Sequence, residues 1–130
     1  MNVLITLPKH LIDKIISGEK KYEMRKCLPK NMRIGEDGFF VVEKGTDKIR
    51  CWCSVYRVIK GFASDYSAAY FAPYLCVPEA YVRRYAKDKM VYLWKIGIVV
   101  TYNGLKRDSL LIKRNPQNFA YCPLSYGKSN

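Results

Sequence analysis

The chain opens on an alternating pattern that soon becomes helical. Val3 and Ile5 alternate with Leu4 and Thr6, which predicts a strand. Pro8 then opens a segment whose apolar residues recur at helical spacing and which Gly18 ends. The apolar positions of that segment are Leu11, Ile12, Ile15 and Ile16. A strand followed by one short helix is therefore expected here.

Residues 20–26 predict a second strand. Because side chains alternate along a strand, Lys21, Glu23 and Arg25 share one face, and Tyr22 and Met24 share the other. Three charged groups are thus expected side by side.

The next segment predicts a hairpin. Residues 29–38 have the composition of a loop, and residues 39–43 form a short strand that ends before Gly45. A longer strand over residues 49–59 follows. Its apolar set is Ile49, Cys51, Cys53 and Val55, and its opposite, aromatic and basic set is Arg50, Trp52, Ser54 and Tyr56.

The middle of the chain is more helical. Over residues 61–74 the pattern weakens, and Pro73 closes one irregular helix. Pro78 and Glu79 are typical of the first turn of another helix. In that helix we expect Ala80, Tyr81 and Tyr85 to face inward and Arg83, Arg84 and Lys87 to face water.

The C-terminal part predicts more sheet. Residues 91–101 are apolar on both faces, as in a central strand, and Asn103 and Gly104 then turn the chain. Two short strands near residues 109–113 and 118–122 complete a mixed sheet. The fold class expected is α+β.

Length and composition indicate one soluble domain. The 130 residues are 49% hydrophobic and 26% charged, which is ordinary for a single globular core. A chain of this size folds without disulfide or metal staples. No apolar run is long enough to span a membrane, and no secretory signal precedes the first strand. We expect a cytoplasmic protein that does not bind membranes.

The net charge favours an anionic partner. Lys and Arg number 23 against 11 Asp and Glu, which gives +12. Residues 1–60 carry 13 basic and 7 acidic side chains and residues 61–130 carry 10 and 4, so each part contributes +6. An excess spread over the folded body suits a nucleic-acid surface better than a clustered membrane signal. A surface that only confers solubility is the alternative.

The cysteines and the histidine do not suggest a metal site. The five cysteines contain no C-x-x-C pair, and His10 is the only histidine. Cys51 and Cys53 have the spacing of small core residues in a strand, as expected in a reducing compartment. The chain also lacks phosphate-loop, dinucleotide-binding and triad motifs. We therefore expect neither a metal nor a cofactor.

One motif points to a family. Residues 18–25 fit G-x-K-x-x-E-x-R after a strand and a short helix, and residues 114–119 fit R-x-P-Q-x-F. Together they resemble the ASCH domain of the PUA-like superfamily, over most of the chain. The resemblance implies a single domain over residues 2–124, with a frayed tail over 125–130. Its fold would be a PUA-like mixed β pseudo-barrel with short helices packed at its rim.

The resemblance also implies a cleft beside the motif strand that binds RNA, a nucleotide or a modified base, with Lys20, Glu23 and Arg25 as cleft residues. Gly18 allows a tight turn from helix to strand, and Glu23 and Arg25 point to the same side. A carboxylate can hold the Arg fork toward phosphate or accept hydrogen bonds from a base edge. The alternative is an exposed ion pair that contributes about 0 to 1 kcal/mol.

Two enzymatic alternatives use the same cleft, with Lys20 and Glu23 as the catalytic residues. Some small ASCH proteins are amidohydrolases on acetylated cytidine, but Glu23 stands where they have a threonine. Their third residue, a glutamate, falls near Pro73 here, with Asp65 or Glu79 as displaced candidates. A ribonuclease would use Glu23 as base, Lys20 as acid and Arg25 as phosphate clamp. A carboxylate among cations has a lowered pKa and is a weaker base.

Binding without catalysis requires fewer specifically placed residues than an enzyme does, and it is the function predicted. Trp52 and Tyr56 can stack bases beside Arg50, although both are also ordinary core residue types. Further contacts are expected from Lys21 and, at the cleft, from Arg114 and Gln117. Other candidate phosphate contacts are Arg83, Arg84, Lys87, Lys106, Arg107 and Lys113. A module that docks an acidic protein, as in phages or mobile elements, is the remaining alternative.

Overall fold

A computed structural model describes residues 1–62, 65–87 and 89–123. Residue 124, where the domain is predicted to end, and the tail over 125–130 lie outside these ranges. In the described part, six strands form one mixed sheet in the order β2-β5-β4-β3-β1-β6. β1 and β3 are parallel, and the other neighbours are antiparallel. The strands are β1 (Val3–Leu7), β2 (Tyr22–Arg25), β3 (Gly38–Glu43), β4 (Ile49–Phe62), β5 (Met90–Thr101) and β6 (Ala120–Tyr121).

The first helix covers one face of the sheet. α1 (Lys9–Ser17) begins after Pro8 and ends at Gly18, which has φ 85° and donates its N–H to the Ile15 carbonyl. Ile12 and Ile15 are buried against strands β1, β3 and β4. This core also holds Cys51 and Cys53, which confirms that the two cysteines are small core residues. The predicted strand and helix at the N-terminus are confirmed.

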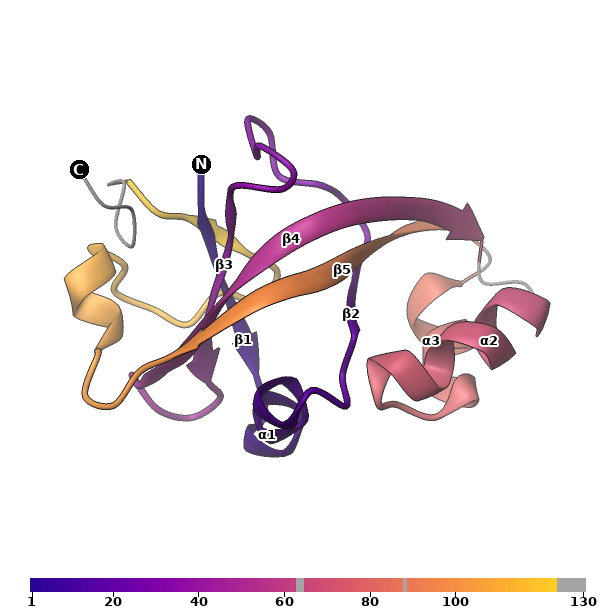
Figure 1. The fold of residues 1–130 in the computed structure, drawn as a ribbon, viewed down its shortest axis with the longest axis horizontal. Coiled ribbons are helices and arrows are strands. Elements are labelled where there is room, and N and C mark those ends of the chain that lie inside the picture. Colours follow the sequence, from indigo (N-terminus) through magenta and orange to yellow (C-terminus); the bar gives the residue numbers. More distant parts are fainter. Residues whose placement is uncertain (63–64, 88, 124–130) are drawn as a thin grey trace.

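A second core lies at one end of the sheet. Figure 1 shows α2 (Asp65–Leu75) and α3 (Glu79–Ala86) together at the far end of the long strands β4 and β5. Tyr22 and Met24 of β2 pack into this core with Val82 and Ala86 of α3. Of the three residues of α3 predicted to face inward, Tyr85 is half-buried and packs against this core. Ala80 and Tyr81 are exposed, so the prediction is wrong for those two.

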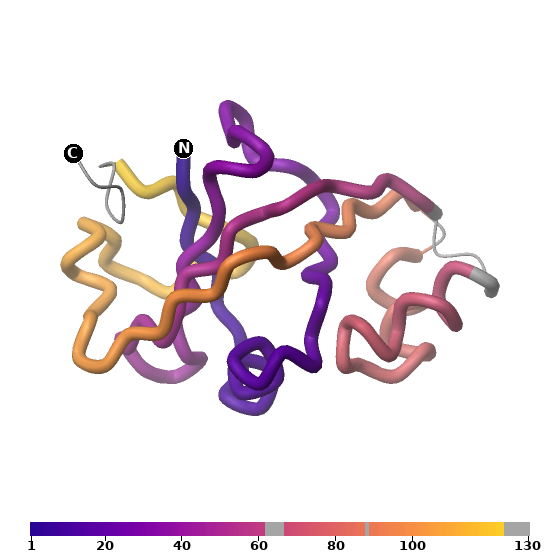
Figure 2. The backbone as a smooth tube through the Cα atoms, in the orientation of Figure 1, coloured from indigo at the N-terminus to yellow at the C-terminus, as the bar shows by residue number. Residues whose placement is uncertain are grey.

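The C-terminal segment returns to the N-terminus. In Figure 2 the yellow trace runs back beside the first strand, where β6 pairs with β1. A short 3-10 helix, η1 (Arg107–Leu110), lies where the strand over residues 109–113 was predicted, so that prediction is wrong. Leu110 and Cys122 are buried with Leu4 and Phe40 in a third core. The short final strand is confirmed.

Irregular pairing in β4 changes which side chains lie together. The register with β3 shifts between Val41 and Val42, and two further shifts occur in the pairing with β5. As a result Ile49 packs in the third core, whereas Cys51 packs beside α1. The predicted apolar set is therefore confirmed for Cys51, Cys53 and Val55, which share the first core, and wrong for Ile49, since strict alternation assumes an unbroken ladder.

Candidate functional site

The G-x-K-x-x-E-x-R segment is placed by the end of α1 and the start of β2. The left-handed turn at Gly18 brings Lys20 back to α1, where its backbone N–H donates to the Lys14 carbonyl at 3.0 Å. Glu23 and Arg25 then project from one side of β2, because Tyr22 and Met24 pack into the second core on the other. The strand begins at Tyr22, two residues later than predicted.

Three buried charged side chains form an ion-pair network that we call the triad: Lys20, Glu23 and Arg25. Lys20 Nζ lies 3.2 Å from Glu23 Oε1, and Arg25 Nε donates to Glu23 Oε2 at 2.7 Å. Their exposed fractions are only 3%, 4% and 7%. An exposed ion pair, the alternative raised from the sequence, is therefore excluded.

Backbone carbonyls from two distant segments complete the network. Lys20 Nζ donates to the Leu75 carbonyl at 3.0 Å, at the C-terminal end of α2. Arg25 Nη1 donates to the Asn118 carbonyl at 2.8 Å. A lysine ammonium has three N–H donors and a guanidinium has five, so the two cations keep further donors for a ligand.

The triad holds its carboxylate in the ionised form. Burial alone would raise the pKa of Glu23, but the positive charges of Arg25 and Lys20 and their hydrogen bonds outweigh it and lower that pKa. The lowered pKa was expected from the sequence. It makes Glu23 an acceptor of hydrogen bonds and a weak general base at neutral pH.

The triad lies in a cleft of about 950 Å³, a volume suited to a nucleotide-sized ligand. The described residues lining it carry four cationic side chains and one carboxylate, so their formal charge is +4 − 1 = +3 with His10 neutral. The cations are Lys20, Arg25, Lys26 and Lys44. Such a surface attracts anions, because like charges around a concavity reinforce one another's field.

One wall of the cleft is the segment 115–118. Thr6 Oγ1 donates to the Pro116 carbonyl at 2.8 Å, and Asn115 Nδ2 donates to the Thr46 carbonyl at 2.8 Å. Gln117 is exposed and lines the cleft as predicted, whereas Arg114 is exposed and is not among the described lining residues.

Four other predicted binding residues also lie outside the described cleft lining: Lys21, Arg50, Trp52 and Tyr56. Lys21 is exposed before β2 begins, so the expected line of three charges on one strand face is wrong. Arg50 pairs with Glu43 at 2.7 Å and Asp13 at 3.3 Å. Arg50, Trp52 and Tyr56 were expected on one face of β4, and the irregular pairing of that strand breaks this face.

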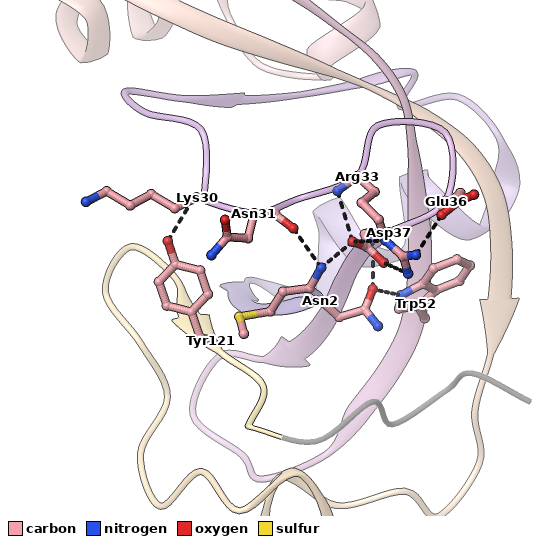
Figure 3. A network of polar contacts seen from close by, with 10 residues as sticks. Asn2, Lys30, Asn31, Arg33, Glu36, Asp37, Trp52 and Tyr121 are labelled. Carbon is pink, nitrogen blue, oxygen red and sulfur yellow. Dashed lines mark hydrogen bonds and ion pairs between the residues drawn. The ribbon is translucent and has the colours of Figure 1, made fainter. Parts of the chain in front are cut away.

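Trp52 belongs to a structural network at the N-terminal strand (Figure 3). Its Nε1 donates to Asn2 Oδ1 at 3.2 Å, and the same oxygen accepts the Gly38 N–H at 2.8 Å. The indole also packs against the third core. Tyr56 is 62% exposed, with Lys95 Nζ 5.6 Å from its ring centroid.

Sequence reasoning missed part of the cleft. Tyr81 and Tyr85 line it from α3. Tyr85 also packs against the second core as expected, whereas Tyr81 was expected to face inward and is exposed. Lys26 and Lys44 also line it. The clearest available signal was Lys26, which directly follows the motif arginine.

The residues considered for catalysis are only partly assembled. Among the described lining residues Glu23 is the one carboxylate, and Pro73 does not line the cleft. Glu79 Oε1 lies 3.1 Å from Arg83 Nη2, and Glu79 does not line the cleft either. The side chain of Asp65 lies outside the described part.

Residues 1–62, 65–87 and 89–123 contain neither a cluster of metal-ligand side chains nor a membrane-spanning helix. No group of three or more His, Cys, Asp and Glu side chains there is placed to hold a metal ion. No helix within these ranges combines the length and the apolar character that a membrane span requires.

Solved structures share this architecture. The ASCH protein of Zymomonas mobilis superposes with a TM-score of 0.76 at 13% identity, covering 92% of this chain and 86% of that one. Its serine-to-alanine and tyrosine-to-phenylalanine variants match equally well, with 87% and 88% of their chains covered. No protein-family model and no curated protein matches the sequence.

These likenesses establish the class of fold. The six-stranded mixed sheet, with α1 against one face and α2 and α3 at one end, is the PUA-like α+β half-barrel. More particularly, it is the fold of the ASCH domain, as the motif predicted.

Proposed function

We propose that this protein binds RNA, or a nucleotide with or without a modified base, in the cleft beside β2. The observation that carries the proposal is the charge of the cleft: four cations and one carboxylate among its described lining residues. That carboxylate already has two cationic partners, so the remaining positive charge is available to phosphate. The ASCH fold and the net charge of +12 support an anionic nucleic-acid ligand.

Binding accounts for the site better than acid-base catalysis does. The lowered pKa of Glu23 favours an acceptor that orients Arg25 over a base that removes protons. Glu23 also stands in place of the hydroxyl residue used by the amidohydrolase subset. Hydrolysis of RNA or of acylated cytidine is the alternative outcome. Chromatography after incubation with the protein would detect it as shortened oligomer or as free cytidine, respectively.

The experiment is fluorescence anisotropy of a labelled RNA oligomer over a salt series. If four cations contact a single strand, the logarithm of affinity should fall against the logarithm of salt with a slope of about −3. The double variant Lys26→Ala/Lys44→Ala should reduce that slope by about half. Both lysines are exposed, so the fold should survive.

Arg57→Ala is the matched control, since Arg57 is exposed and is not among the described cleft residues. It should leave the slope almost unchanged. No binding at low salt by the folded wild type would reject nucleic acid. An acidic protein would then be the expected partner, and its binding should respond to charge reversal at Arg84 on α3.

A further inference from the structure

Two tyrosine rings lie nearly parallel at the cleft. Tyr81 and Tyr85 are four residues apart on α3, so they share one face of the helix. Their ring centroids are 6.3 Å apart, and the angle between the ring planes is 17°. Both line the cleft, and Tyr81 remains 44% exposed. A large aromatic ring is therefore accessible to a ligand in a strongly cationic concavity.

The less exposed ring, that of Tyr85, also contacts a cation of the cleft. Lys26 Nζ lies 4.9 Å from the centroid of Tyr85, within range of a cation–π interaction. Burial raises the pKa of Tyr85, and the charges of Arg25 and Glu23 act on that pKa in opposite directions. Tyr85 therefore contacts both Lys26 and the more exposed ring of Tyr81.

Cations and aromatic rings recognise different parts of a ligand. Lysine side chains bind phosphate whether or not a base is attached, and they carry no information about the base. A tyrosine face is attractive to a flat π system, and stacking on it tolerates every nucleobase. A cleft that combines both has complementary partners for the two halves of a nucleotide.

We propose that Tyr81, held by Tyr85 and Lys26, is the stacking surface for a nucleobase whose phosphates lie on the lysines of the cleft. This inference rests on the proposed function and adds the contact that distinguishes a nucleotide from a bare polyanion. It makes Tyr81 a binding residue and Tyr85 a positioning residue.

The test compares two labelled probes of equal length and charge, an oligouridine and an abasic ribose-phosphate oligomer, by anisotropy with the full chain. The wild type should bind the oligouridine about 5-fold to 150-fold more tightly, as one stacked base would produce. Tyr81→Leu should lower the oligouridine affinity to that of the abasic probe and leave the abasic affinity unchanged. Tyr81→Phe should retain the preference.

Tyr70→Leu is the matched control, because Tyr70 is a 52% exposed tyrosine of α2 outside the described cleft lining. It should keep the wild-type preference. A second variant, Tyr81→Trp, places a fluorophore at the proposed contact. Its emission should be quenched more strongly by oligouridine than by the abasic probe.

The outcomes separate the two proposals. An unchanged preference in folded Tyr81→Leu, or a Tyr81→Trp emission that responds equally to both probes, would overturn the stacking surface. The proposed function would stand in that case, provided the wild type binds with the expected salt dependence. Failure of the wild type to bind either probe would overturn the proposed function itself.

Discussion

Lys20 Nζ donates to the carbonyl of Leu75 at 3.0 Å, which ties the motif to the last residue of α2. The negative end of the helix dipole lies at that terminus, so a buried cation is well placed there. The adjacent backbone makes a second link, from the Lys21 N–H to the Tyr74 carbonyl at 2.7 Å. The motif lysine therefore has a structural role besides any contact with a ligand.

We expect Lys20→Met to destabilise the fold by about 3 to 5 kcal/mol, because it leaves the buried Glu23 with one cationic partner and removes the donor from the Leu75 carbonyl. Urea denaturation measures this loss. Lys21→Met is the matched control, since Lys21 is exposed, and it should leave the urea midpoint unchanged. Equal midpoints for the two variants would contradict a structural role for Lys20.

The stability contributed by Glu23 should depend on pH. Its pKa in the folded protein lies below the ordinary value of 4.5. The stabilisation is therefore fully present above about pH 4.5 and is lost as the pH falls through the lower folded pKa. The wild type should therefore have a much larger free energy of unfolding than Glu23→Gln at neutral pH, and this difference should decrease as the pH becomes acidic.

Urea denaturation of both proteins at several pH values checks this expectation. Glu19→Gln is the control, because Glu19 pairs with Lys14 in an exposed position, and its midpoint should differ little from the wild type at neutral pH. A wild-type advantage over Glu23→Gln that stays constant down to strongly acidic pH would show that Glu23 does not carry the charge inferred.

Gly38 should not tolerate a side chain. A Cβ there would lie far inside the van der Waals contact distance to the Cys53 carbonyl oxygen on the neighbouring strand. Gly38→Ala should therefore destabilise the protein by about 3 kcal/mol or more, since the obstacle is backbone. Gly61→Ala is the control, because a Cβ at Gly61 meets no atom within 4 Å. Thermal melting of both variants decides the point, and similar melting temperatures would refute it.

The prediction that Tyr56 stacks on a base can be tested separately. Tyr56 is 62% exposed and is not among the described residues lining the cleft. If the cleft binds the ligand, Tyr56→Ala should leave the anisotropy isotherm for RNA unchanged. A loss of affinity as large as that caused by Tyr81→Leu would place the binding surface on β4 instead.

The sequence predicted the parts of the fold that depend on local pattern. The strand and helix up to Gly18 follow from alternation, helical spacing and the requirement of a left-handed turn for a residue without Cβ. The motif also brought together Lys20, Glu23 and Arg25, which the structure places in one network. These relationships lie within one short segment of the chain.

Long-range relationships were not predictable in the same way. The Leu75 and Asn118 carbonyls that complete the triad are backbone groups, which every residue type carries, so no side chain marks them. The irregular pairing of β4 likewise has no strong signature in Arg50 or its neighbours. On α3, the apolar body of Tyr81 suggested burial, although a tyrosine also suits the edge of a cleft.

The most direct test of the cleft as the RNA site is a backbone amide NMR titration of the isotopically labelled chain with a short oligouridine. The largest shift changes should fall on Lys26, Lys44, Tyr81 and Gln117, which line the cleft from four different segments. The amides of Tyr56 and Ile98, exposed on β4 and β5, should change little. Changes concentrated on β4 and β5, with the four cleft amides unaffected, would contradict RNA binding in the cleft.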